Sequence, residues 1–139
     1  MKQIKVFLDS SVIFAGLASS KGGSFQVLLL IEAGIIIPYV SGQVVTEVTQ
    51  NAQRKLPEVA DAFYALFKVL KFNLIDPTEN NLLYAKKLIN KKDAGILAAA
   101  ITAEVDWLLS LDKHFLRSRW KNVVDFSVGT PGDFLQKCP

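Results

Sequence analysis

The stretch "VFLDSSVIF", residues 6–14, joins a run of large apolar residues to a single acidic residue, Asp9. Together with Ile4, the run at 6–8 lacks the strict alternation of a strand that has one face in water. It therefore predicts a parallel strand that is covered by helices on both faces. Asp9 stands where this strand should end, and a carboxylate at that point can either cap a turn or take part in chemistry.

Segments typical of strands and of helices alternate along the rest of the chain. Helices are expected at 24–33, 41–55, 58–70, from Pro77 to about Ile89, at 93–105 and, as a short element, from Pro131. Strands are expected at 72–76, 107–111 and 123–128, and the segment 35–40, which contains Pro38, is expected to be an edge strand or a connection. Ser24 and Ser41 are the expected N-caps of the first two helices, and Gly34 is the expected terminator of the first. This alternation predicts a three-layer α/β/α sandwich with a mostly parallel central sheet, formed by residues 1–139 as a single domain.

The composition favours a globular protein. Hydrophobic residues make up 50% of the 139 residues, which argues against disorder. No apolar run reaches the roughly 18 to 20 residues of a membrane span, and Asp9 interrupts the apolar stretch that a signal peptide would need. Cys138 is the only cysteine, which excludes an internal disulfide, so we expect a cytoplasmic protein that does not associate with membranes. The net charge of +3 is too small to identify a nucleic-acid binder by itself.

Two acidic residues follow predicted strands. Asp9 comes after the first strand and Asp112 after the strand at 107–111. Because ligands of parallel α/β sheets bind outside the carboxyl ends of the strands, both side chains are expected at that edge. Asp106 precedes the same strand, and six extended residues of ~3.3 Å each place it ~20 Å from Asp112. We therefore expect Asp106 at the opposite edge of the sheet.

Two further acids lie near helix starts on inward faces. Asp93, in the first turn of the alanine-rich helix, shares a face with Leu97 and Ala100. Glu47 repeats the pattern beside Val48 in the helix at 41–55. The helix dipole stabilises an acid in a first turn, but it does not explain why the acid points toward the core.

The four carboxylates can converge at one edge of the sheet, and they would then repel one another. The sequence places no lysine or arginine at an obviously inward position beside them, so the repulsion calls for another positive charge. A divalent cation with oxygen ligands, Mg²⁺ or Mn²⁺, meets this need and leaves room for water and phosphate. Each acid taken singly is more commonly a turn or capping residue, and only the joint placement favours a site.

Four stretches resemble the PIN-domain family, the metal-dependent nucleases that include the toxins of VapBC-type toxin–antitoxin pairs. They are "VFLDSSVIFAGL", "VSGQVVTEV", "KDAGILAAAITAEVDWLLSLDKHFL" and "VGTPGDFL", in the family's order and over essentially the whole chain. Matched motif by motif, the family's acidic residues correspond to Asp9, Glu47, Asp93 and Asp112, and its supporting hydroxyl residues to Ser11 and Ser110. The chain departs from the family's pattern in reading "DKHF" where many relatives have a further acid, and "DSS" where they often have Asp-Thr-Asn.

The resemblance implies a ribonuclease that hydrolyses RNA phosphodiester bonds with one or two Mg²⁺ or Mn²⁺ ions. Asp9, Asp93 and Asp112 would be metal ligands, and Glu47 a ligand directly or through water. Ser11 and Ser110 would orient the carboxylates. The resemblance also implies a homodimer and, for a toxin, a cognate antitoxin.

Basic residues surround two of these acids. Lys92 precedes Asp93, and Lys113, His114 and Arg117 follow Asp112; they are predicted to hold the RNA backbone, or else to form an ordinary solvated face. His114 could also shuttle a proton or have a structural role.

Two other functions stay open on the sequence alone. Phosphotransfer through Asp9, as in haloacid-dehalogenase-like phosphatases, uses a second acid two residues later, where this chain has Ser11. A non-catalytic RNA-binding or scaffolding protein that keeps the fold is the alternative from a different class, and His114 in the last motif motivates it.

Overall fold

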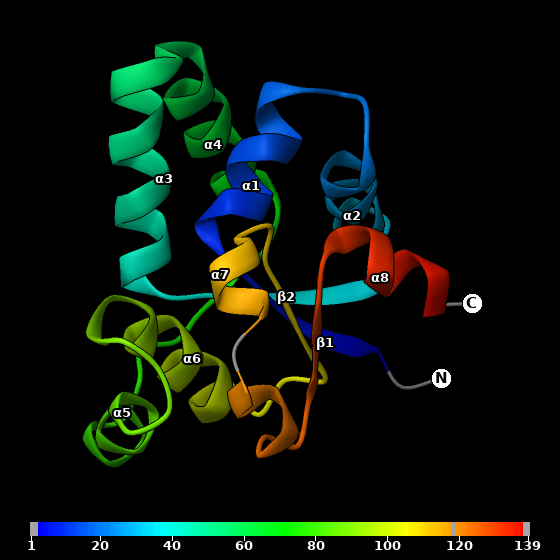
Figure 1. Cartoon of the computed structure of the whole chain (residues 1–139). Coiled ribbons are helices and arrows are strands. Elements are labelled where there is room, and N and C mark those ends of the chain that lie inside the picture. Colours follow the sequence, from blue (N-terminus) through cyan, green and yellow to red (C-terminus); the bar gives the residue numbers. More distant parts are fainter. Residues whose placement is uncertain (1–2, 118, 138–139) are drawn as a thin grey trace.

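The computed structural model describes residues 3–117 and 119–137 and shows a five-stranded parallel sheet between layers of helices (Figure 1). The strands are β1 (Ile4–Leu8), β2 (Ile36–Val40), β3 (Asn73–Leu74), β4 (Trp107–Leu109) and β5 (Ser127–Gly129). Their spatial order is β3-β2-β1-β4-β5, and every neighbouring pair is parallel. The predicted α/β/α sandwich with a parallel central sheet is therefore confirmed.

The helices form two layers around this sheet. They are α1 (Ser10–Ala18), α2 (Gly23–Glu32), α3 (Gly42–Lys55), α4 (Pro57–Val69), α5 (Glu79–Lys86), α6 (Lys91–Ala103), α7 (Lys113–Leu116) and α8 (Pro131–Lys137), with a 3₁₀ turn at Arg119–Asn122. Helices α5 and α6 pack together, while α1 packs against α2, α3 and α4, and α2 against α8 (Figure 1). Among the described residues, no single helix is long and apolar enough to cross a bilayer; α1 and α2 reach the required length and composition only as a pair bent by 94°.

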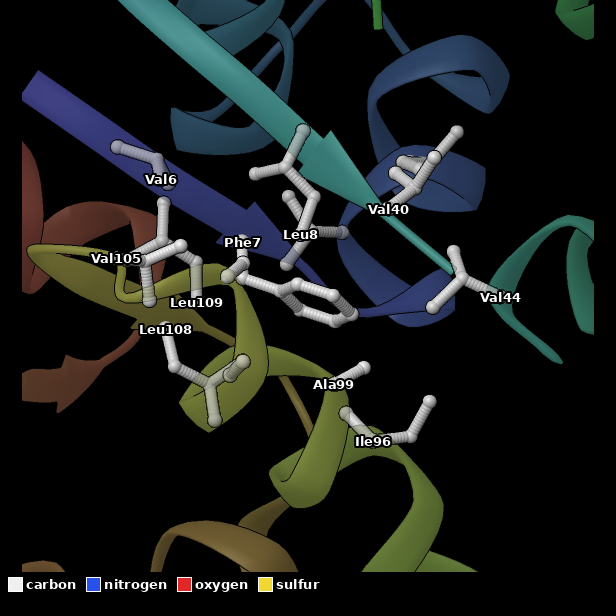
Figure 2. Packing of buried hydrophobic residues seen from close by; sticks show 14 of the residues in the cluster. Val6, Phe7, Leu8, Val40, Val44, Ile96, Ala99, Val105, Leu108 and Leu109 are labelled. Carbon is white, nitrogen blue, oxygen red and sulfur yellow. The ribbon is translucent and has the colours of Figure 1, made fainter. Parts of the chain in front are cut away.

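Strand β1 is buried on both faces. Val6, Phe7 and Leu8 are each 0% exposed, although successive side chains of a strand point to opposite faces. Figure 2 shows Phe7 pointing toward Ile96 and Ala99 of α6, which cover one of these faces. The continuous apolar run thus reflects a strand enclosed by two helix layers, as predicted.

The strand order reverses between β1 and β4. From β1 the chain builds outward through β2 and β3, and it then returns to the other side of β1 with β4 and β5. At such a switch point the connections after two neighbouring strands diverge and leave room for a ligand at their carboxyl ends. Asp9 follows β1 at this point, and its backbone N–H donates to the carbonyl of Leu109, the last residue of β4, at 3.0 Å.

The expectation that residues 35–40 form an edge strand or a connection is wrong. Strand β2 lies inside the sheet, between β1 and the short strand β3. Pro38 pairs with Val6 of β1, and its backbone faces the β3 side, as that of Val40 does. Since β3 begins only opposite Tyr39, the missing N–H of Pro38 removes no hydrogen bond between strands.

The predicted caps have mixed outcomes. Ser41 is the N-cap of α3 and accepts from the backbone N–H of Val44 at 3.3 Å, as predicted. Ser24 is not a cap, because α2 begins at Gly23 after Gly22, whose φ of 107° favours glycine. Gly34, at φ 78°, follows the end of α2 and takes the expected terminating conformation.

Several predicted boundaries shift. Strand β3 covers two residues of the predicted 72–76, β5 only 127–129, and α5 ends at Lys86 instead of Ile89. Strand β4 ends at Leu109, so Asp112 stands three residues beyond it rather than directly after it. Helix α1 was not predicted, and it starts without a loop because Asp9 is its N-cap.

Candidate active site

The four predicted carboxylates line one pocket of about 280 Å³ at the carboxyl edge of the sheet. Asp9 reaches it from the end of β1, Glu47 from α3, Asp93 from the first turn of α6 and Asp112 from the segment after β4. The remaining lining residues are Ser10, Ser11, Gln50, Asn51, Arg54, Lys92 and Ile96. Strand ends and helices around the switch point thus bring together acids that lie up to 103 positions apart in the sequence (112 minus 9).

Asp9 is the most enclosed of these acids, at 9% exposed. Its Oδ2 accepts from the hydroxyl of Ser110 at 2.7 Å and from that of Ser11 at 3.3 Å, while Oδ1 accepts from the N–H of Ser10 at 2.8 Å. Burial raises the pKa of Asp9, the hydrogen bonds from Ser110 and Ser10 lower it in part, and the charge of Glu47 raises it again. The main causes of this shift include no lysine or arginine, and a cation at the pocket would stabilise the ionised form.

Two serine hydroxyls connect Asp9 to the segment that carries Asp112. Ser11 Oγ donates to Asp9 and accepts from the N–H of Leu111 at 3.0 Å. Ser110 Oγ, which is fully buried, donates to the same carboxylate and accepts from the N–H of Asp112 at 3.1 Å. Each hydroxyl therefore fixes both the orientation of Asp9 and the backbone that places the last acid.

Glu47 is held from two sides. Its Oε1 accepts from Ser10 Oγ at 3.0 Å, and its Oε2 accepts from Gln43 Nε2 at 3.3 Å. The same amide nitrogen donates to the carbonyl of Lys92 at 3.1 Å, so Gln43 ties Glu47 on α3 to the first turn of α6. The contact depends on Gly95, because a Cβ at that position would lie only 2.1 Å from Gln43 Oε1.

Asp93 and Asp112 also take part in local capping. Asn90 accepts from the Asp93 N–H through Oδ1 and donates to Asp93 Oδ2 through Nδ2, both at 3.0 Å. Asp112 Oδ1 accepts from the N–H of Phe115 in α7 at 3.4 Å. Each of these two acids therefore has the capping role expected of a single acid at its position, and each also lines the pocket.

The donor chemistry of the pocket fits a hard divalent cation. Four carboxylates, with serine hydroxyls beside them, are the oxygen ligands that Mg²⁺ and Mn²⁺ prefer. Within the described part of the chain, however, no three His, Cys, Asp or Glu side chains stand close enough together to hold a metal ion. A cation at this pocket would therefore have to draw the carboxylates toward one another.

The pocket contains basic and amide side chains that sequence reasoning missed. Two basic residues line it: Arg54, which donates to Asn51 Oδ1 at 2.7 Å, and Lys92, which was predicted beside the site. Both are exposed, in keeping with the expectation that neither a lysine nor an arginine points inward there. The missed residues on α3 are Gln50 and Arg54, which line the pocket, and Gln43, which does not line it but donates to Glu47. The helical period held a signal for two of them, since Gln43 stands four residues before Glu47 and Arg54 seven after it, on the same face.

The predicted RNA-binding residues divide into two groups. Lys92 lines the pocket, whereas Lys113 and Arg117 are exposed and are not among its lining residues. His114 belongs to α7, but its side chain lies outside the described residues. Asp106 lies at the opposite edge, as predicted: its carboxylate accepts from the N–H of Lys5 in β1 at 2.9 Å.

The sequence profile of the PIN domain matches residues 5–114, a span that includes all four acids. The chain belongs to the PIN-domain family. Solved structures with the same fold include VapBC2 from Rickettsia felis bound to a DNA fragment from its promoter, with 14% identity, a TM-score of 0.64, and coverage of 90% of this chain and 97% of the other. Among curated proteins, no sequence matches significantly.

Two further PIN-like structures share the architecture. VapC20 from Mycobacterium tuberculosis, described as a sarcin-ricin loop cleaving toxin, is 16% identical with a TM-score of 0.55, over 80% of this chain and 92% of the other. PAE2754 from Pyrobaculum aerophilum is 16% identical with a TM-score of 0.60, over 96% of this chain and 88% of the other. At these identities the likeness concerns the fold.

Proposed function

We propose that this PIN-domain protein is a metal-dependent endoribonuclease that hydrolyses RNA phosphodiester bonds. The observation that carries the proposal is the enclosed carboxylate of Asp9 at the switch point, held by two serine hydroxyls in a pocket with three other acids. Burial and the neighbouring Glu47 raise the pKa of Asp9, which is the electrostatic setting that a divalent cation relieves.

The roles proposed for the acids follow the family's pattern, and those of the serines agree with their hydrogen bonds. Asp9, Asp93 and Asp112 would hold Mg²⁺ or Mn²⁺, and Glu47 would bind it directly or through water. A bound cation of this kind activates a water molecule and stabilises the charge that develops on the phosphate. Ser11 and Ser110 keep Asp9 in place, while Lys92 and Arg54 offer positive charge to phosphates at the pocket.

The proposal is tested by incubating the protein with unstructured RNA and Mn²⁺. We expect cleavage that EDTA abolishes and that Asp9→Asn reduces by more than about 100-fold, because a metal ligand matters at least as much as the residues that support it. Asp106→Asn is the matched control, since it changes the same residue type at the opposite edge of the sheet. Equal cleavage by Asp9→Asn and wild type would rule the proposal out.

A non-catalytic RNA-binding protein is the second candidate. It is favoured by the spacing of the acids, because no three of the described acidic, His or Cys side chains form a ready metal group. Calorimetric titration with Mn²⁺ separates the two functions: the nuclease should bind the ion with an affinity that Asp93→Asn abolishes, whereas the binding protein should not bind it.

We further propose that the chain is the toxin of a toxin–antitoxin pair and acts as a cytoplasmic homodimer. Similar structures include a VapBC complex and a VapC toxin, which support this assignment at the level of the fold. Co-expression with the product of a small neighbouring reading frame should relieve growth arrest if that product is the antitoxin. Light scattering gives the oligomeric state.

A further inference from the structure

A second, larger pocket lies between α5 and α6, beside the pocket lined by the four acids. We call the latter the catalytic pocket, after its proposed function. The second pocket has a volume of about 660 Å³ and is lined by Gln43, Pro77, Leu82, Lys86, Lys91, Lys92 and Gly95. The half-buried Pro77, Leu82 and Gly95 form its floor, and the exposed lysines form its rim. We call this pocket the lysine groove.

The lysine groove continues into the catalytic pocket. Lys92 lines both, and Gln43, which lines the groove, donates its amide hydrogen bonds to Glu47 and to the Lys92 carbonyl. A chain molecule bound at the acids can therefore extend into the groove across a shared wall.

The charge of the lysine groove is one-sided. Among its described lining residues three are lysines and none is acidic, in contrast to the neighbouring pocket, which four acids line. Phosphate groups bind such a rim by releasing counterions, and an apolar floor suits the faces of unpaired bases.

Two of the lysines occupy positions that do not favour helix stability. Lys91 and Lys92 are the first two residues of α6, after its N-cap Asn90. The helix dipole places partial positive charge at this end, so cations there are unfavourable and acids are preferred. Their presence is more readily explained by an external anion than by the fold.

We propose that the lysine groove binds the single-stranded RNA that adjoins the phosphate to be cleaved, with backbone phosphates on Lys86, Lys91 and Lys92 and bases against Pro77 and Leu82. This inference rests on the proposed ribonuclease function and extends it from the point of cleavage to the neighbouring nucleotides.

The test is equilibrium binding of fluorescein-labelled dodecauridylate, followed by anisotropy in EDTA with the RNA checked for integrity. In Lys86→Ala/Lys91→Ala we expect affinity at low salt to fall roughly tenfold, and the slope of log K against log salt to decrease in magnitude by about 1.4, which is 0.7 for each lost phosphate contact. The melting temperature of this variant should not fall, because Lys91 is removed from the unfavourable end of α6.

The matched control is Lys55→Ala/Lys87→Ala, which removes the same charge from exposed sites that are not among the residues lining the groove. It should leave affinity within about twofold of wild type. Dodecaglutamate, with similar charge but no bases, should bind at least tenfold more weakly than the RNA. Equal losses in the two double variants, or equal binding of the peptide, would overturn the inference and, in the second case, point to an acidic protein segment.

Cleavage of the same RNA with Mn²⁺ separates this inference from the proposed function. RNA binding that depends on Lys86 and Lys91, without cleavage, would uphold the groove and overturn the nuclease. Cleavage with an unchanged KM in the groove variant would uphold the nuclease and overturn the groove. A wild-type protein that neither binds the RNA at low salt nor cleaves it would overturn both, whereas cleavage without such binding would overturn the groove alone.

Discussion

The two edges of the sheet use the same residue type in opposite ways. At the amino edge, Asp106 is exposed and accepts from the backbone N–H of Lys5, while its own N–H donates to the Lys5 carbonyl. At the carboxyl edge, Asp9 is buried and accepts from two serine hydroxyls beside a second acid, Glu47. Asp106 completes the hydrogen bonding between two strands. Asp9 is instead buried beside a second acid, so that its ionised form is unfavourable unless a cation binds nearby.

The largest effect expected from this contrast is on metal-dependent stability at Asp9. Because burial raises its folded-state pKa, Asp9 contributes stability that is fully present below the unfolded pKa and is lost as the pH rises through the folded pKa. At neutral pH, Mn²⁺ should therefore raise the melting temperature of wild type by several degrees. In Asp9→Asn the metal-free protein should melt at the same temperature or higher, and the Mn²⁺ response should disappear. Asp106→Asn should behave as wild type; a lower melting point for metal-free Asp9→Asn would show that its charge is already compensated.

The next effect concerns the support of Asp9. Ser110→Ala removes a buried hydroxyl that donates to Asp9 at 2.7 Å and accepts from the N–H of Asp112. We expect RNA cleavage to fall about 10- to 100-fold and unfolding free energy to fall by about 1–3 kcal/mol, since the Asp9 carboxylate loses a buried donor and the part-buried N–H of Asp112 loses its acceptor. Denaturant unfolding and initial rates measure the two changes. Ser127→Ala in β5, which is exposed, is the control. Equal effects of the two substitutions would show that the contacts of Ser110 with Asp9 and Asp112 do not matter for activity or stability.

A smaller effect is expected at the contact between α3 and α6. Gly95→Ala places a methyl group where Gln43 now lies, so Gln43 must release Glu47. We expect cleavage to fall by several-fold, with Gln43→Ala giving a similar loss and the double variant little more than either alone. Initial rates with saturating RNA test this cycle. Fully additive losses would show that Gly95 acts by another route.

The smallest effect is expected at the amino edge. Asp106→Ala removes the acceptor for the Lys5 N–H, a loss of about 1 kcal/mol or less because the group is exposed. Denaturant unfolding should show this change while cleavage stays at the wild-type rate. A large loss of activity in this variant would break the contrast between the two edges.

The sequence was most informative where burial or capping is local. The apolar run at 6–8 revealed a strand covered on both faces, and Ser41 announced the start of α3, because each signal depends on neighbouring residues alone. The edge of the sheet at which the acids gather also followed from strand and helix order.

The missed features depend on long-range packing. Helix α1 contains Val12 and Ile13, two residues of modest helix propensity. Their complete burial outweighs this low propensity. The prediction at Pro38 failed because β3 pairs with β2 only from Tyr39 onward, so that the missing N–H of Pro38 removes no hydrogen bond between strands, and no local pattern reveals this. Likewise, the close contact of Gln43 with Gly95 connects α3 and α6, and neither residue by itself predicts this contact from the sequence.

The hydrogen bond between Ser110 and Asp9 also bears on the stage of folding at which the pocket can form. Its two residues are 101 positions apart, and both lie at the ends of neighbouring central strands. Contacts of such separation form only after the intervening chain has folded back. During synthesis from the N-terminus, a chain in which β4 has not yet been made lacks the shorter of the two hydroxyl contacts that orient Asp9, and it lacks the segment that carries Asp112. The order of the strands thus delays assembly of the pocket until most of the polypeptide has been made, so that truncated products cannot form it.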